Sequence, residues 1–110
     1  MQFTVAREDR PQGTVLSVHG DLDIATVKTL RAQVEDVVRS GTSRLCLDLS
    51  PTTFIDSTGC RELVRAARSG SASGTAVELL VPPENWRVRR VVDFMQFGAL
   101  LPVHDEAPFA

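Results

Sequence analysis

Short apolar runs along the chain predict five strands. They cover residues 3–7, 14–19, 45–49, 76–81 and 100–104. The third run is nearly all apolar, as in a central strand that is covered on both faces. The last run contains Pro102, which would confine it to an edge of the sheet.

Apolar residues at helical spacing predict a first helix after the second strand. Asp21 or Asp23 can cap its start, and Gly41 marks its end. The residues expected on its inward side are Ile24, Val27, Leu30, Val34, Val37 and Val38.

Two further helices are expected between the later strands. The second runs from about Thr58 to Gly70, and a flexible loop over residues 69–75 follows it. Its apolar positions are Cys60, Leu63, Val64 and Ala67. The third follows the two prolines at 82–83 and stops at Gly98. Its inward residues are expected to be Val88, Val91, Val92 and Met95.

This alternation of strands and helices is typical of an α/β domain. We expect a mixed sheet of four to five strands, antiparallel in the N-terminal hairpin and parallel where helices connect the strands. The amphipathic helices would pack on this sheet. A length of 110 residues fits one domain over residues 1–110, with a short flexible tail at about 105–110.

Composition and charge exclude several classes of function. The net charge of −2 argues against direct binding of nucleic acid, because domains that bind phosphate backbones are usually basic. No apolar stretch approaches the roughly 20 residues that span a bilayer, and the N-terminus does not resemble a signal peptide. The chain is therefore expected in the cytoplasm and not in a membrane.

The cysteines and histidines predict no cofactor. Cys46 lies in a strand pattern and Cys60 in the first turn of a helix, so both are expected to be buried free thiols. His19 and His104 are isolated in the sequence, without the spacing of metal ligands. We therefore predict neither a metal site nor another cofactor.

The most informative segment is residues 45–59. A buried strand leads through a short connection into Asp56, Ser57, Thr58 and Gly59 at the start of a helix. Unpaired backbone N–H groups and the helix dipole favour negative charge there. A phosphorylated hydroxyl would add about −1.5 to −2 charges where the fold tolerates them best. The segment therefore indicates a phosphorylation switch.

The run from Ile55 to Gly59 (Ile-Asp-Ser-Thr-Gly) resembles the phosphorylation motif of STAS-domain anti-sigma factor antagonists. Residues 18–25 are similar to that family's turn into its first helix, and residues 87–92 with 97–98 to its third helix and glycine stop. The resemblance covers nearly the whole chain. The chain departs from the family on the expected docking surface, at Pro51, Cys60 and the pair at 61–62.

The resemblance implies a STAS-type fold and a binding function without enzymatic activity. Ser57 would be phosphorylated by a cognate anti-sigma factor that is itself a serine kinase, with Thr58 as the less favoured acceptor. The unphosphorylated chain would bind this kinase and free a sigma factor. Phosphorylation would abolish binding, and a metal-dependent serine phosphatase would restore it. Members of the family are monomers or dimers, so we expect a monomer or a weak homodimer.

The expected partner-binding surface comprises Asp21, Asp23, Asp56, Ser57, Thr58, Gly59 and Arg61. In the bound kinase, Asp56 either orients the acceptor hydroxyl or approaches the metal that accompanies ATP; alternatively it is a helix-end acid that favours the dipole. Gly59 either lets the partner backbone approach or is simply tolerated in the first turn. Arg61, with Arg65 and Arg68 on the same outer face, either meets acidic groups on a partner or is solvated, and Arg61 could instead pair with the phosphate.

Three other interpretations compete with this one. STAS domains also serve as accessory subunits of membrane transporters, where the same helix face is a docking module. A hydrolase with Ser57 as nucleophile lacks a Gly-x-Ser-x-Gly motif and a placed histidine. Finally, Ser57 could be a helix cap without function.

Overall fold

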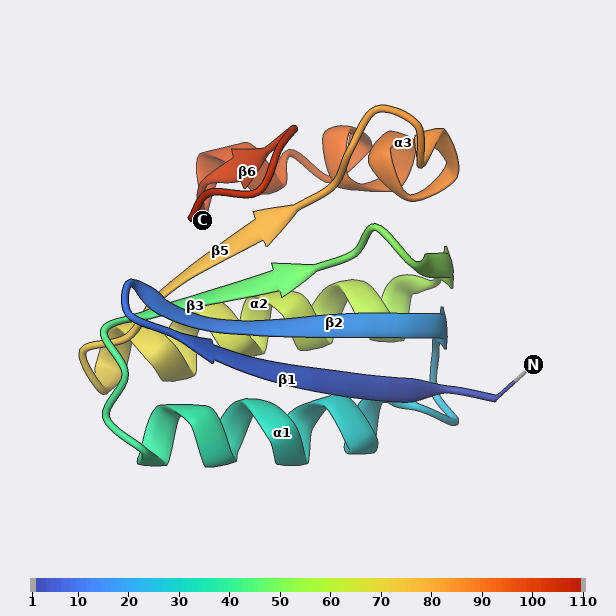
Figure 1. The fold of residues 1–110 in the computed structure, drawn as a ribbon. Coiled ribbons are helices and arrows are strands. Elements are labelled where there is room, and N and C mark those ends of the chain that lie inside the picture. Colours follow the sequence, from blue (N-terminus) through green and yellow to red (C-terminus); the bar gives the residue numbers. More distant parts are fainter. Residues whose placement is uncertain (1, 110) are drawn as a thin grey trace.

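The computed structural model describes residues 2–109, in which six strands form a mixed sheet (Figure 1). Five of them follow the order β1-β2-β3-β5-β6, and the sixth, β4, pairs with β2 outside this order. β1 and β2 form an antiparallel hairpin, and the other pairs are parallel. β4 pairs with β2 further along than β3 does. The strands are β1 (Thr4–Arg10), β2 (Gly13–Leu22), β3 (Arg44–Asp48), β4 (Thr52–Ile55), β5 (Ala76–Leu80) and β6 (Val103–His104).

Helices α1 (Val27–Arg39) and α2 (Ser57–Ala72) lie side by side on one face of the sheet (Figure 1). The main core fills the space between them and the sheet, with Leu16, Leu47 and Leu63 fully buried in it. Helix α3 (Trp86–Phe94) packs against β4 and leads into a short 3₁₀ turn, η1 (Phe97–Ala99). The α/β architecture with a mixed sheet is thus confirmed.

The sheet has one strand more than expected, because residues 52–55 form β4. From the sequence, its short length and two threonines indicate a connecting segment and not a strand. Pairing with the end of β2 supplies the backbone partners that make it a strand. Thr52 strengthens this pairing, since its Oγ1 donates to the carbonyl of Val18 at 2.7 Å.

The first helix begins later than predicted. Its N-cap is Thr26, and Asp23 instead stabilises the preceding turn by accepting a hydrogen bond from the N–H of Ala25 at 2.9 Å. Ile24 lies in this turn with 77% of its surface exposed. The expectations that an aspartate caps α1 and that Ile24 faces inward are therefore wrong, because the turn adds residues before the helical pattern starts.

The ends of α2 and α3 also differ from the prediction. Gly70 lies inside α2, where a β-carbon would come within 2.6 Å of Val77 on β5. The helix ends instead before Gly74, whose left-handed φ of 82° suits glycine. Gln96, with φ 56°, takes the corresponding place after α3, so Gly98 does not stop that helix and Met95 is 49% exposed.

The C-terminal residues were expected to form a flexible tail, but they lie against the second face of the sheet. Phe109 is 5% exposed and packs with Val15, Cys46 and Leu80. Arg10 donates to the carbonyl of Phe109 at 3.1 Å. Because strand side chains alternate, this cluster lies opposite the main core.

Candidate functional site

The start of α2 is organised by Asp56, which is its N-cap. The Asp56 Oδ1 atom accepts a hydrogen bond from the N–H of Gly59 at 2.9 Å, and the Asp56 carbonyl accepts from the N–H of Cys60. Ser57 is therefore the first residue of the helix and not its cap. The alternative that Ser57 is retained as a helix cap is wrong, because Asp56 occupies that role.

The Ser57 side chain is exposed, and its hydroxyl makes no hydrogen bond within residues 2–109. Thr58 beside it is half-buried, and its Oγ1 accepts a long bond of 3.4 Å from Arg61. The N–H groups of Ser57 and Thr58 precede the first intrahelical bond, which begins at Cys60. The exposed Ser57 hydroxyl thus lies beside two backbone donors that have no partner within residues 2–109.

Parallel pairing of β4 with β2 brings the chain around Asp21 and Asp23 close to the chain around Asp56. Leu22 is opposite Ile55, and the N–H of Asp56 donates to the Leu22 carbonyl at 3.3 Å. Asp23, which follows Leu22, therefore lies beside the start of α2. The sequence analysis grouped these residues by resemblance, and the register explains their proximity.

Gly59 is buried against this same segment. A β-carbon there would lie 2.5 Å from the Leu22 carbonyl oxygen and 2.8 Å from Ile55. The packing of α2 on the ends of β2 and β4 therefore requires a residue without a side chain. This internal contact is enough to explain why residue 59 is a glycine. A role of Gly59 in partner binding stays a prediction.

The two aspartates of the preceding segment point to different neighbours. Asp21 accepts a hydrogen bond from Thr53 on β4 and lines a hollow between β4 and α3. Asp23 holds the turn before α1, because its backbone N–H donates to Thr26 Oγ1 at 2.9 Å. Their contacts are therefore with β4 and with the turn before α1, respectively.

The arginines of α2 do not share one outer face. Arg61 is exposed near the site, but Arg65 donates to Glu62 at 3.0 Å and approaches Glu35 on α1. Glu62 is 1% exposed at its side chain and also accepts two hydrogen bonds from Arg31 on α1. The expected outer face of three arginines is wrong for Arg65, because a buried glutamate joins the two helices.

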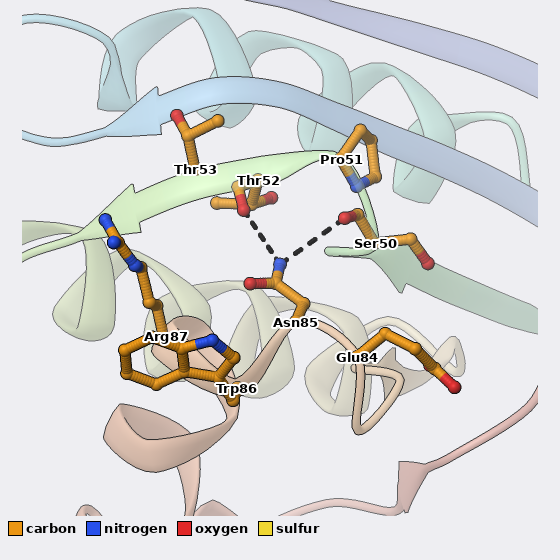
Figure 2. A pocket seen from close by; sticks show the side chains of 8 residues that line it. All are labelled: Ser50, Pro51, Thr52, Thr53, Glu84, Asn85, Trp86 and Arg87. Atoms are coloured by element: carbon orange, nitrogen blue, oxygen red, sulfur yellow. Dashed lines mark hydrogen bonds between the residues drawn. The ribbon is translucent and has the colours of Figure 1, made fainter.

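The loop before the site is held by Asn85, which the sequence analysis did not single out. Its Nδ2 atom donates to the carbonyls of Leu49 at 2.9 Å and Thr52 at 2.8 Å, with a longer contact to Ser50. Figure 2 shows this amide between the loop and the start of α3. Asn85 thus fixes the course of the chain into β4.

Exposed aromatic residues gather near the site; of these the sequence had singled out only Trp86, either as an interface anchor or as a rim or core aromatic. Phe54 is 52% exposed, Trp86 54% and Phe94 86%. Together with Arg87 and Val91 they line two adjoining hollows, one between β4 and α3 and the other along the outer side of α3. No periodicity marks such a surface, because its residues come from a short strand and from the outer side of a helix.

The cysteines are both buried free thiols, as expected. Burial raises the pKa of Cys46 to about 12 and also raises that of Cys60, so neither is a reactive thiolate at neutral pH.

His104 is not isolated in the fold, since its Nε2 lies 2.8 Å from Glu78. Within residues 2–109 no group of three or more His, Cys, Asp or Glu side chains is placed to hold a metal ion. Among the described helices, none has the length and apolar character needed to cross a membrane.

Comparisons with known proteins agree with this geometry. The family model described as "Mlab, STAS domain" matches residues 5–102. An anti-sigma factor antagonist from Mycobacterium paratuberculosis is 25% identical, with a TM-score of 0.80 over 96% of this chain and 87% of its own. The Thermotoga maritima protein TM1081 is 23% identical, with a TM-score of 0.82 over 93% and 86% of the two chains.

The anti-sigma factor antagonist SpoIIAA of Bacillus has the same fold and is solved in both phosphorylation states. Its unphosphorylated form is 22% identical, with a TM-score of 0.68 over 96% of this chain and 90% of its own. The family model spans most of the chain, from β1 to the residue before β6. The chain therefore belongs to the STAS-domain family, whose members among its structural neighbours include anti-sigma factor antagonists.

Proposed function

We propose that this chain is an anti-sigma factor antagonist controlled by phosphorylation of Ser57. Its unphosphorylated form binds a cognate anti-sigma factor serine kinase in the cytoplasm and so frees a sigma factor. Phosphorylation abolishes this binding, and a metal-dependent serine phosphatase restores it. The observation that carries the proposal is the exposed Ser57 hydroxyl, which the fold leaves unused because Asp56 caps the helix.

The structure favours Ser57 over Thr58 as the acceptor. A kinase must reach the hydroxyl and align it with a phosphoryl group, which requires an accessible side chain. Ser57 is exposed, whereas Thr58 is half-buried and contacts Arg61. The role proposed for the chain is that of substrate and binding partner, not of enzyme.

A phosphate on Ser57 would meet opposing electrostatic influences. The free N–H groups of Ser57 and Thr58 and the helix dipole favour the anion. The adjacent Asp56 carboxylate, which already binds the N–H of Gly59, repels it. Because these effects offset each other, the fold itself need not change on phosphorylation.

The docking surface changes far more than the fold does. A partner shaped for a hydroxyl would have to desolvate a doubly charged group beside the acids Asp23 and Asp56. Like charges at an interface cost several kcal/mol, or about a hundredfold in affinity. Local repulsion is thus sufficient for a switch.

The proposal is tested by capture from a lysate of the native host with Ser57→Ala and Ser57→Asp as matched baits. We expect the alanine bait to retain a small ATP-binding kinase that the aspartate bait loses. Incubation of that kinase with ATP and the wild-type chain should then place the phosphate on Ser57. Equal retention by both baits, or phosphate on another residue, contradicts the proposal.

The same experiment addresses the alternative that the chain is an accessory subunit of a membrane transporter. In that case both baits should retain a membrane ATPase, because a docking module need not respond to the charge at Ser57. The exposed, unbonded hydroxyl favours the kinase as partner.

A further inference from the structure

The outward side of α3 carries a second stripe of residues at helical spacing. Val88 and Val92 form the buried stripe that packs into the core. Arg87, Val91 and Phe94 lie along the adjoining face, at the i, i+4 and i+7 positions, and Val91 at its inner edge also packs against the core. Phe94 is 86% exposed on this face, so the helix carries apolar surface that the fold leaves uncovered.

This outer stripe continues across the gap to β4. One hollow is lined by Phe54, Ile55, Arg87 and Val91, and the adjoining one by Trp86, Val91, Phe94 and Met95 among others. Figure 2 shows Trp86 and Arg87 side by side at the start of α3, below β4. We call this surface, made of Phe54, Trp86, Arg87, Arg90, Val91, Phe94 and Met95, the α3 groove.

One residue of the α3 groove, Phe54, lies just before the phosphorylation site in the chain. Phe54 is two residues from Asp56 on the strand that leads into α2. A partner that covers Ser57 is therefore placed to bury the near end of the groove. Exposed Trp, Phe and Met with arginine is the composition that interface cores favour.

The charge of the groove selects the partner's chemistry. The guanidinium groups of Arg87 and Arg90 lie 5.2 and 5.9 Å from the Trp86 ring, and neither forms an ion pair within residues 2–109. Of the two acids at the rim, Asp93 pairs with Arg89, whereas Asp21 accepts a hydrogen bond from Thr53 at the β4 end and keeps its charge. The groove thus offers unpaired positive charge beside apolar surface.

We infer that the α3 groove binds an acidic amphipathic helix of the partner protein. Helix packs on helix through stripes of this spacing, and acidic residues on its flank would pair with Arg87 and Arg90. An anionic membrane is the less suitable occupant, because such binding usually draws on clusters of four to eight basic residues. The inference rests on the proposed function for the identity of the partner.

The test uses the kinase captured by the Ser57→Ala bait and measures its affinity for variants of that bait. Trp86→Ala and Arg87→Glu should each weaken binding tenfold or more, which corresponds to about 1.4 kcal/mol. Leu100→Ala is the matched apolar control, because Leu100 is 59% exposed outside the groove. Arg39→Glu is the matched charge control at the far end of α1. Both controls should leave affinity unchanged, and thermal unfolding should show that all four variants fold.

A cross-link identifies the occupant directly. With p-benzoylphenylalanine in place of Phe94, we expect the cross-linked peptide to come from a kinase helix with acidic residues three or four apart. A cross-link to a second copy of this chain overturns the inference, as does flotation with phosphatidylserine vesicles that Trp86→Ala abolishes. If the Ser57 baits still discriminate while Trp86→Ala and Arg87→Glu bind like the controls, the groove inference fails and the proposed function stands. If the baits do not discriminate, the proposed function fails first.

Discussion

At the scale of single residues, Asp56 and Ser57 have separate roles at the start of α2: Asp56 caps the helix, and Ser57 presents an exposed hydroxyl. Asp56 satisfies the N–H of Gly59, and this leaves the Ser57 hydroxyl available for chemistry. The acidic residue before the acceptor could be recognised in the sequence as a helix-end acid. Its capping bond could not, because the cap position depends on where β4 ends.

Asp56→Ala should therefore destabilise the fold by about 1 kcal/mol, the usual contribution of an N-cap side chain. Asp56→Asn should retain most of that stability, since asparagine caps helices equally well. Urea unfolding measures both effects. If Asp56→Asn also slows phosphorylation of Ser57 more than it weakens kinase binding, the carboxylate helps to orient the acceptor. Equal losses of rate and affinity would indicate a docking role.

Gly59→Ala should cost about 1–3 kcal/mol of stability, because its β-carbon would overlap the Leu22 carbonyl and Ile55. Gly98→Ala is the matched control, since a β-carbon there meets nothing within 4 Å. Equilibrium unfolding of both variants compares them directly. Equal stability of the two variants would show that α2 moves to accommodate the methyl group, contrary to tight packing at this contact.

At the scale of elements, the helices and the central strands follow from the hydrophobic pattern, whereas β4 and the C-terminal segment do not. β4 has only four residues, and its identity as a strand comes from pairing with β2. Phe109 is a single apolar residue near the end of the chain, so it has no periodicity to interpret. Both segments acquire their structure from contacts that are distant in sequence.

The packing of Phe109 on the sheet predicts a link between the C-terminal segment and a thiol. Phe109→Ala should cost about 2 kcal/mol, because a buried phenylalanine side chain and its contact with the Arg44 guanidinium are lost. It should also expose Cys46, which packs beneath it, to alkylation by iodoacetamide. Cys60, on the buried side of α2, lies in the main core and serves as the internal control. Mass spectrometry should show faster modification of Cys46 alone; a parallel increase at Cys60 would indicate global unfolding instead.

The pairing between β3, β5 and β6 carries a buried carboxylate whose ionisation stabilises the sheet. Arg44 donates two hydrogen bonds to Glu78, at 2.7 and 2.8 Å, and these with the bond to His104 lower the pKa of Glu78 below its usual 4.5. A lowered pKa means that the folded state favours the charged form. The resulting stabilisation is fully present above about pH 4.5 and is lost as pH falls through the folded-state pKa.

Glu78→Gln should therefore lower stability most at neutral pH, and its difference from the wild type should shrink as the solution becomes acidic. Chemical unfolding over the acid range measures this difference, in which the titrations of the other carboxylates largely cancel. The same series in His104→Gln separates the contribution of the histidine from that of Arg44. A difference that stays constant with pH would mean that Glu78 contributes by packing alone.

At the scale of the whole molecule, the fold assembles the site from segments that lie far apart in the sequence. The β2–β4 pairing brings residues 21–23 beside residues 56–59, and Asn85 ties the start of α3 to the loop before β4. The sequence predicted the first group through family resemblance and missed the second. An amide that bridges three carbonyls leaves no pattern, since its partners are backbone atoms.

This arrangement predicts that stability and partner binding respond differently to charge at Ser57. Ser57→Asp should change the free energy of unfolding by less than about 1 kcal/mol, because the helix dipole and the Asp56 carboxylate act in opposite directions. Its affinity for the kinase should nevertheless fall about a hundredfold, as expected for an uncompensated charge at an interface. Ser71→Asp is the matched control, because it adds the same charge to an exposed position in the last turn of the same helix.

The salt dependence of that affinity distinguishes local repulsion from a change of shape. If repulsion by the charge at position 57 causes the loss, raising the ionic strength should narrow the gap between Ser57→Ala and Ser57→Asp, since screening shortens the reach of exposed charges. Ser71→Asp should bind like the wild type at every salt concentration. A gap that does not depend on salt, together with a large loss of stability in Ser57→Asp alone, would mean that the charge disrupts the start of α2. In that case the switch would operate through the fold and not through the docking surface.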